Sequence, residues 1–167
     1  MATAWPRLRI LTLGILVGWG ARHPPRATIR GLIPLVEHCP DISDIGYRMR
    51  ADVTGWGTSR TVDRPLAGDG VMARHPIRLN VGDSRIHNAI KVASFLSDIS
   101  PQVLSIHSLW NCTIHILLDD DDEEDEVEAE EMLRKWDLVA HYVPHFGMVR
   151  MQERIFALTQ VTSLPVH

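Results

Sequence analysis

The residues with catalytic potential are few in this sequence and do not form a known catalytic motif. Asp69 and His75 have the side-chain types that exchange a proton in general acid–base catalysis, but no nucleophile accompanies them. The sequence contains no G-x-S-x-G, G-x-x-x-x-G-K-[ST], G-x-G-x-x-G or H-E-x-x-H motif. We therefore expect a protein that is not an enzyme, with no catalytic residues and no cofactor.

Two groups of potential metal ligands are present, and neither has the context of a metal site. His141 and His145 are four residues apart, as in a helical ligand pair, but Pro144 lies between them. The acidic run Asp119–Glu126, DDDDEEDE, lacks the central glycine with which an EF-hand loop makes its turn. Because like charges repel, we expect this run to be disordered inside the domain, and we expect no metal site.

The length and charge of the chain indicate one globular domain over residues 1–167. The net charge is −4, and residues 119–131 hold 11 of the 21 acidic residues but none of the 17 basic ones. The arginines elsewhere are scattered along the chain, which favours a solvated surface over a nucleic-acid interface. We therefore expect no nucleic-acid partner.

The cysteines and the N-terminus leave the compartment open. Cys39 and Cys112 form no C-x-x-C motif, and Cys39 ends an apolar helical stretch, so we expect it in the core. A disulfide between the two would require an oxidising compartment. The segment 7–21 is either a signal peptide or a buried strand, and it is too short to span a membrane. We favour the strand, and hence a cytoplasmic or nuclear protein without a membrane partner, with secretion as the alternative.

Four segments share a proline followed by spaced apolar residues: 6–13, 40–47, 76–82 and 101–106. Proline fits the first residue of a strand, and the apolar spacing is typical of leucine-rich-repeat strands. Parallel strands need crossover connections, which are usually helical. The sequence therefore predicts an α/β fold, a leucine-rich-repeat-like partial solenoid of short parallel strands with helices on the other side.

Helical periodicity predicts three helices, of which the first two lie between proline-led segments. The first covers about 27–38, with Thr28 as N-cap. The second contains Ile86, Ala89, Ile90, Ala93 and Leu96 and is capped by Asp83 or Ser84. The third runs from about Val127 to Tyr142, and Pro144 ends it. The segments 109–118 and 158–161 are predicted as further strand segments.

The glycine- and arginine-rich segment 48–74 is predicted to be a surface loop excursion. Tryptophan and arginine are the residues that most often anchor protein interfaces. Trp56, Arg48 and Arg50 are therefore the candidate binding residues, with a core contact as the alternative role of Trp56.

An ordered set of short motifs resembles the C-terminal leucine-rich-repeat-like part of F-box proteins from mushroom-forming fungi. The matching residues run through nearly the whole chain: Leu35–Pro40 (LVEHCP), Leu79–Ser84 (LNVGDS), Val92–Ser97 (VASFLS), Trp136 and Val149–Glu153 (VRMQE).

The resemblance implies a protein-binding module that recognises targets for a cullin-type ubiquitin ligase. In that family an F-box segment binds a Skp-type adaptor, and this sequence shows no such segment. The resemblance therefore implies that this chain is the target-recognition part of a substrate adaptor without its F-box. Such a fragment would bind the Skp-type adaptor only if a missing F-box were present. The target protein is not indicated. The alternatives are a non-functional truncated gene product and a secreted protein with a signal peptide.

Overall fold

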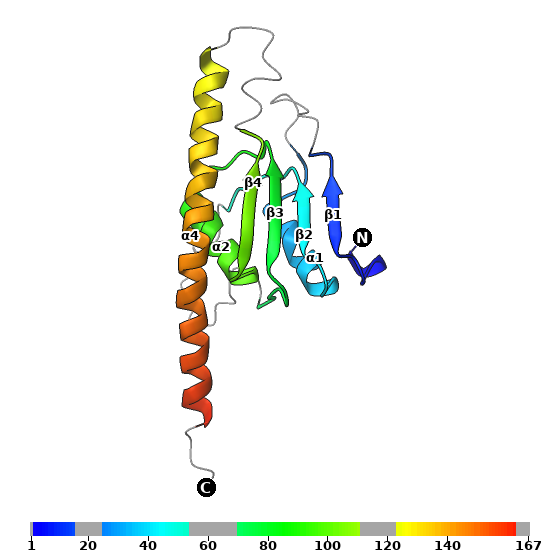
Figure 1. The fold of residues 1–167 in the computed structure, drawn as a ribbon, viewed down its shortest axis with the longest axis vertical. Helices are drawn as coiled ribbons and strands as arrows, with labels where there is room; N and C mark the ends of the chain where they lie inside the picture. Colours follow the sequence, from blue (N-terminus) through cyan, green and yellow to red (C-terminus); the bar gives the residue numbers. More distant parts are fainter. Residues whose placement is uncertain (1, 16–24, 54–69, 111–122, 163–167) are drawn as a thin grey trace.

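The four proline-led segments form one parallel sheet. The computed structural model describes residues 2–15, 25–53, 70–110 and 123–162. The strands are β1 (Ile10–Leu13), β2 (Asp44–Tyr47), β3 (Ile77–Gly82) and β4 (Val103–Ser108), in the order β1-β2-β3-β4 (Figure 1). Every neighbouring pair is parallel. The prediction of an α/β chain with short parallel strands is confirmed.

One face of the sheet is apolar and packed against helices. The register aligns Leu11, Ile45, Leu79 and Ile106 in one row across all four strands. In β3 the side chains alternate, so that Ile77, Leu79 and Val81 are buried while Arg78 is exposed. Successive residues of a strand point to opposite faces, and the predicted apolar face of this strand is therefore confirmed.

Two short helical segments cover the first part of this face. The 3-10 helix η2 (Ile29–Gly31) leads into α1 (Leu32–His38), and a further 3-10 turn, η1 (Ala2–Ala4), lies near the N-terminus. Thr28 occupies the predicted N-cap position, but its side chain makes no capping hydrogen bond. Cys39 is completely buried, as predicted, and its thiol donates a hydrogen bond to the carbonyl oxygen of Trp5 at 3.4 Å.

The helix α2 (Ala89–Ile99) starts later than the sequence predicts. Asn88 is its N-cap, because its Oδ1 accepts a hydrogen bond from the Lys91 N–H at 2.9 Å. Ser84, one of the two predicted caps, instead forms hydrogen bonds inside the core. Ile90, assigned to the apolar stripe, is 46% exposed, and Ile86 is buried ahead of the helix in a bridge with Ala51.

The last helix, α4 (Glu123–Thr162), is much longer than predicted. It includes residues 123–126 of the acidic run, whereas residues 119–122 lie outside the described part of the chain. At 40 residues it measures about 60 Å, and it extends beyond the ends of the sheet (Figure 1). The prediction of a strand at 158–161 is wrong, and most of the predicted strand at 109–118 falls outside the described residues.

Proline 144 does not end α4, contrary to the prediction. An interior proline removes one backbone hydrogen bond and costs about 3 kcal/mol. Pro144 itself is exposed, while its neighbours Val139 and Val143 are completely buried. The apolar face of α4 thus continues past the proline, and its packing offsets the lost hydrogen bond.

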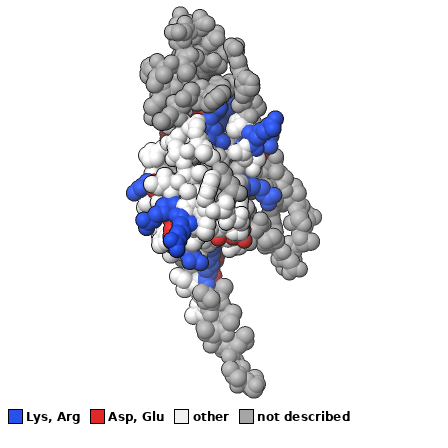
Figure 2. Space-filling view, turned by 90° about the vertical axis from the view of Figure 1, so that its right-hand side faces the viewer, with Lys and Arg blue, Asp and Glu red and all other residues white. Residues whose placement is uncertain are grey.

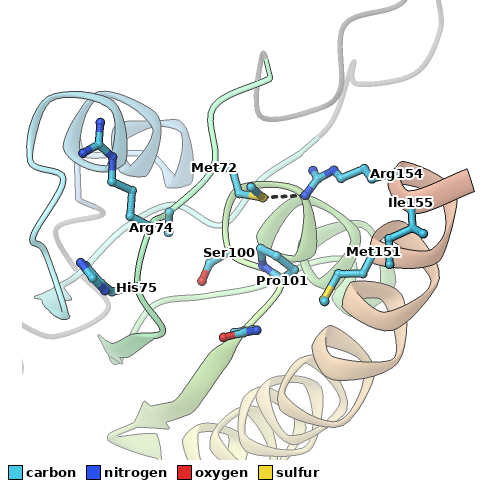
Figure 3. Close-up of a pocket in the computed structure, with 10 residues that line it drawn as sticks. Met72, Arg74, His75, Ser100, Pro101, Met151, Arg154 and Ile155 are labelled. Carbon is cyan, nitrogen blue, oxygen red and sulfur yellow. Dashed lines mark hydrogen bonds between the residues drawn. The ribbon is translucent and has the colours of Figure 1, made fainter. Parts of the chain in front are cut away.

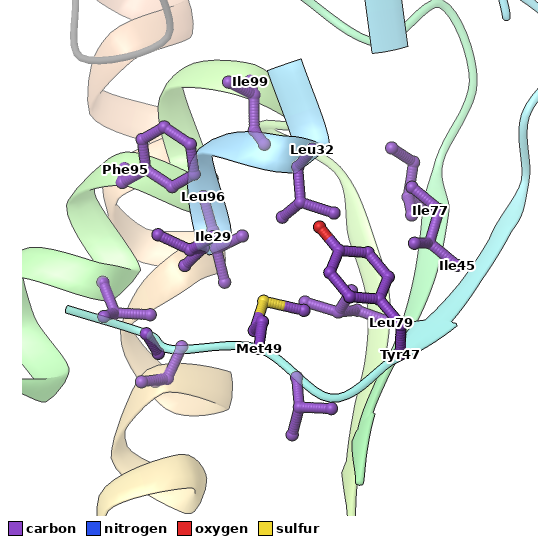
Figure 4. Close-up of a cluster of buried hydrophobic side chains, with 14 of the residues drawn as sticks. Ile29, Leu32, Ile45, Tyr47, Met49, Ile77, Leu79, Phe95, Leu96 and Ile99 are labelled. Atoms are coloured by element: carbon purple, nitrogen blue, oxygen red, sulfur yellow. The ribbon is translucent and has the colours of Figure 1, made fainter. Parts of the chain in front are cut away.

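Ser84 connects three distant parts of the core. Its hydroxyl accepts a hydrogen bond from the Met49 N–H at 2.8 Å. Its carbonyl oxygen accepts from the indole N–H groups of Trp136, at 2.8 Å, and Trp110, at 3.1 Å. Figure 4 shows the apolar cluster in which Met49 lies with Ile29, Leu32 and Leu79. Because an unpaired buried polar group is costly, these bonds fix the position of the turn after β3.

The beginning of the predicted surface excursion is part of the core. Met49, Ala51 and Val53 alternate as buried residues. Arg50 bridges Thr28, and Ala51 bridges Ile86, in parallel pairing. For residues 48–53 the prediction of a surface excursion is therefore wrong; residues 54–69 lie outside the described structure.

Among the described residues, no helix has both the length and the apolar character needed to cross a membrane.

Candidate binding surface

The face of the sheet opposite the core carries two rows of equivalent positions. The register places Ile10, Asp44, Arg78 and Ser105 side by side. The next row contains Thr12, Gly46, Asn80 and His107. We call these eight residues the open sheet face. Ile10 is 63% exposed, and Thr12, Arg78 and His107 are also exposed.

An ion pair lies across the middle of the open sheet face. Arg78 donates from Nη1 to Oδ1 of Asp44 at 3.0 Å, and the Ser43 hydroxyl donates to Oδ2 of the same carboxylate at 2.6 Å. The hydrogen bonds from Ser43 and Arg78 lower the pKa of Asp44. The Arg78 side chain remains 59% exposed. The pair therefore presents a fixed carboxylate next to a guanidinium that keeps donors available to a partner.

Gly46 gives the open sheet face a shallow centre. A Cβ atom at this position would lie 3.1 Å from Cδ1 of Ile15, 3.5 Å from Cβ of Asn80 and 3.6 Å from Oγ1 of Thr12. The absence of a side chain thus lets Ile15 lie over the strand at this point. Ile15 is buried, and it bounds the surface at the carboxyl end of β1.

Among the described residues, basic side chains predominate on the side of the molecule that carries β1. Figure 2 shows several groups of Lys and Arg side chains on this side and few Asp and Glu side chains. Arg7 and Arg9, which precede β1, are exposed. Exposed charges of one sign favour the approach of a partner with the opposite sign.

The sequence-predicted binding residues are not among the eight residues of the open sheet face, but Arg48 borders it: a Cβ atom at Gly82 would lie 3.1 Å from Cγ of Arg48 and 3.7 Å from Cγ2 of Ile15. Arg48 forms an ion pair with Asp83, and both side chains are largely buried, at 13% and 10% exposure. Arg50 is exposed, but its backbone N–H and carbonyl bind Ala27 and Ile29. These contacts give Arg48 a structural partner and hold the backbone at Arg50. Trp56 lies outside the described residues.

The candidate catalytic and metal-binding residues do not assemble into a site in the described part of the chain. Nδ1 of His145 lies 2.8 Å from the carbonyl oxygen of His141, a contact within one helix turn. No group of three or more His, Cys, Asp or Glu residues is placed to hold a metal ion among residues that the structure describes. Asp69, the proposed partner of His75, falls outside them.

Sequence reasoning missed Asp44 and Arg78, although a signal was present. Asp44 lies 34 residues after Ile10, and Arg78 lies 34 residues after Asp44. A constant interval between paired strand residues is typical of a structural repeat. Superimposing the chain on itself at this interval would have placed the three residues in one row.

Comparison with protein-family models, curated proteins and solved structures found no match.

Proposed function

We propose that this chain is a protein-binding module of the leucine-rich-repeat type and that the open sheet face is its recognition surface. The observation that supports the proposal is the strand order: four parallel strands lie side by side in the order of the sequence. Repeat solenoids use this arrangement to bring equivalent positions of successive units onto one extended surface. The same proposal implies that the chain is a partial solenoid whose helices lie on the side opposite the open sheet face.

The side chains on the open sheet face suit a protein partner. Ile10 offers an exposed apolar contact, Arg78 and Asp44 a charge pair, and His107 a polar side chain. Protein interfaces combine such apolar and polar groups and are enriched in arginine. The basic side near β1 adds a preference for an acidic partner surface.

The resemblance to fungal F-box proteins supports a more specific role, target recognition for a ubiquitin ligase. Its motif residues contact one another in the fold: Trp136 binds Ser84, and Arg150 binds Ser97. The motifs therefore act together as one packing pattern, as expected for a shared architecture. In this role the open sheet face holds the target, and a Skp-type adaptor binds only a chain that carries an F-box.

A comparison of two matched double variants tests the proposal. Ile10→Glu with His107→Glu changes the open sheet face. Ile90→Glu with His87→Glu introduces the same residue types at exposed positions in and just before α2. Tagged wild-type and variant proteins are incubated with cell extract of the source organism, and the captured proteins are quantified by mass spectrometry. We expect partners that the first variant loses and the second retains. Equal capture by both variants would refute the assignment of the surface.

A further inference from the structure

A pocket of about 300 Å³ lies at the amino ends of β3 and β4. The segments that precede these strands form two of its walls, and the C-terminal part of α4 forms the third (Figure 3). Met72, Pro101, Met151 and Ile155 supply most of its apolar lining. This volume lies at the lower end of the range for small-molecule sites, and such sites combine an apolar lining with a few polar groups.

The titratable side chains that line this pocket are all basic. Arg74, His75 and Arg154 line it, and no Asp or Glu is among its described lining residues. Figure 3 shows Arg154 reaching from α4 toward Met72, whereas the polar ends of Arg74 and His75 point away from Arg154. Arg154 is therefore the cation placed to contact a ligand, and the other two add to the positive potential at the pocket.

Arg154 has only weak partners for its donors in the described structure. Its Nη1 donates to Sδ of Met72 at 2.6 Å, and its Nη2 lies 3.5 Å from the carbonyl oxygen of Asp98. A thioether is a weak acceptor, and a guanidinium carries five N–H donors. Arg150, one helix turn earlier, instead binds a carboxylate and two serine hydroxyls. A carboxylate would satisfy Arg154 better than its present contacts do.

Ser100 also lines the pocket, but its hydroxyl is buried and is not open to it. The residue is 3% exposed, and its Oγ has no hydrogen-bond partner among the described residues.

We propose that this pocket binds a small amphipathic carboxylate. The carboxylate pairs with the guanidinium of Arg154. The hydrocarbon part lies against Met72, Met151 and Ile155. A planar guanidinium matches the two oxygens of a carboxylate, and flexible methionine side chains adapt to hydrocarbon groups of varied shape. The site is separate from the open sheet face and does not depend on the function proposed for that face.

Calorimetric titration of the full chain with decanoate tests this site. Decan-1-ol, with the same chain length and no charge, is the comparison ligand. We expect saturable binding of decanoate and an affinity for decan-1-ol that is weaker by about tenfold or more. Arg154→Gln lowers the decanoate affinity by about tenfold or more, because it removes a charge-assisted hydrogen bond. Arg134→Gln, at an exposed position of α4, leaves the affinity unchanged.

Three results would overturn the proposal. They are the absence of saturable decanoate binding, equal affinity for decanoate and decan-1-ol, and unchanged affinity in folded Arg154→Gln. Thermal unfolding of each variant establishes that it is folded. If Arg154→Gln fails to fold, the comparison of the two ligands on the wild-type chain decides alone. The variant with Ile10→Glu and His107→Glu retains decanoate binding, which separates this site from the open sheet face.

Discussion

Nε of Arg150 lies 2.6 Å from Oδ1 of Asp98, and this ion pair joins α4 to α2. The Asp98 side chain is 3% exposed and the Arg150 side chain 21% exposed. Arg150 also donates hydrogen bonds to Oγ of Ser97 at 3.1 Å and to Oγ of Ser94 at 3.0 Å. The carboxylate is the more deeply buried partner, so the two residues are not equivalent for stability.

Removal of Arg150 should destabilise the fold more than neutralisation of Asp98. Arg150→Met removes the Arg150 cation from the side of a buried carboxylate, which costs about 3–5 kcal/mol in the free energy of unfolding. Asp98→Asn leaves a partly exposed guanidinium that keeps two serine partners, and we expect a smaller loss. Urea unfolding of both variants measures the difference. Equal losses, or a larger loss in Asp98→Asn, would contradict this account of the ion pair.

Gly147 brings α4 close to the segment before β4. A Cβ atom at Gly147 would overlap the carbonyl oxygen of Pro101 and would lie 3.1 Å from its carbonyl carbon. Gly147→Ala should therefore lower the free energy of unfolding by about 1–3 kcal/mol. This loss is expected even though alanine has a higher helix propensity than glycine. Gln152→Ala, at an exposed position of α4, is the control and should change little. Thermal unfolding measures both, and a stabilised Gly147→Ala variant would refute the contact.

Tyr47 and Gly31 should be energetically coupled. The buried Tyr47 hydroxyl has no hydrogen-bond partner among the described residues, and a Cβ atom at Gly31 would lie 3.1 Å from it. Tyr47→Phe removes an unsatisfied polar group, so we expect stability to rise by about 1 kcal/mol. Gly31→Ala should destabilise the wild type but not Tyr47→Phe, in which the nearest remaining ring atom is 3.9 Å away.

The test of this coupling is a double-mutant cycle measured by urea unfolding. Gly31 has an ordinary helical φ of −59°, so alanine meets no backbone strain there. The contact therefore accounts for any cost of Gly31→Ala. Additive effects of the two substitutions would show that the hydroxyl does not face Gly31.

The Asp44 carboxylate should make stability depend on pH in the acidic range. Hydrogen bonds from Ser43 and Arg78 lower its pKa in the folded state. Its contribution is therefore complete above the unfolded-state pKa of about 3.9 and is lost as the pH falls through the lower folded value. Asp44→Asn should be less stable than wild type at neutral pH, and the difference should shrink below about pH 4. A difference that is constant from neutral pH to about pH 2 would exclude this role.

The strands were predictable because their signals are local. Proline at positions 6, 40, 76 and 101 precedes each strand, and the apolar spacing after it identifies the buried face. The parallel pairing of β1 with β2 and of β3 with β4 followed from the predicted helices between them, whereas no helix was predicted between β2 and β3. Such signals depend on a few consecutive residues, and no distant contact overrides them here.

The remaining features depend on contacts that the sequence does not display. Ser84 has the residue type of a helix cap, but hydrogen bonds with Met49, Trp110 and Trp136 use it in the core. Pro144 has the residue type that ends a helix, but the packing of Val143 on the core offsets its cost. The pocket is assembled from three segments far apart in the chain, so no local pattern indicated it.

Site-specific photo-crosslinking in cells tests the binding role of the open sheet face most directly. A photoreactive amino acid replaces Thr12 or His107 on the open sheet face, or His87, which is exposed ahead of α2. The account predicts covalent adducts with the same partner protein from positions 12 and 107 and none with that protein from position 87. Absence of adducts at positions 12 and 107, or equal yields of the same adduct at all three positions, would contradict it.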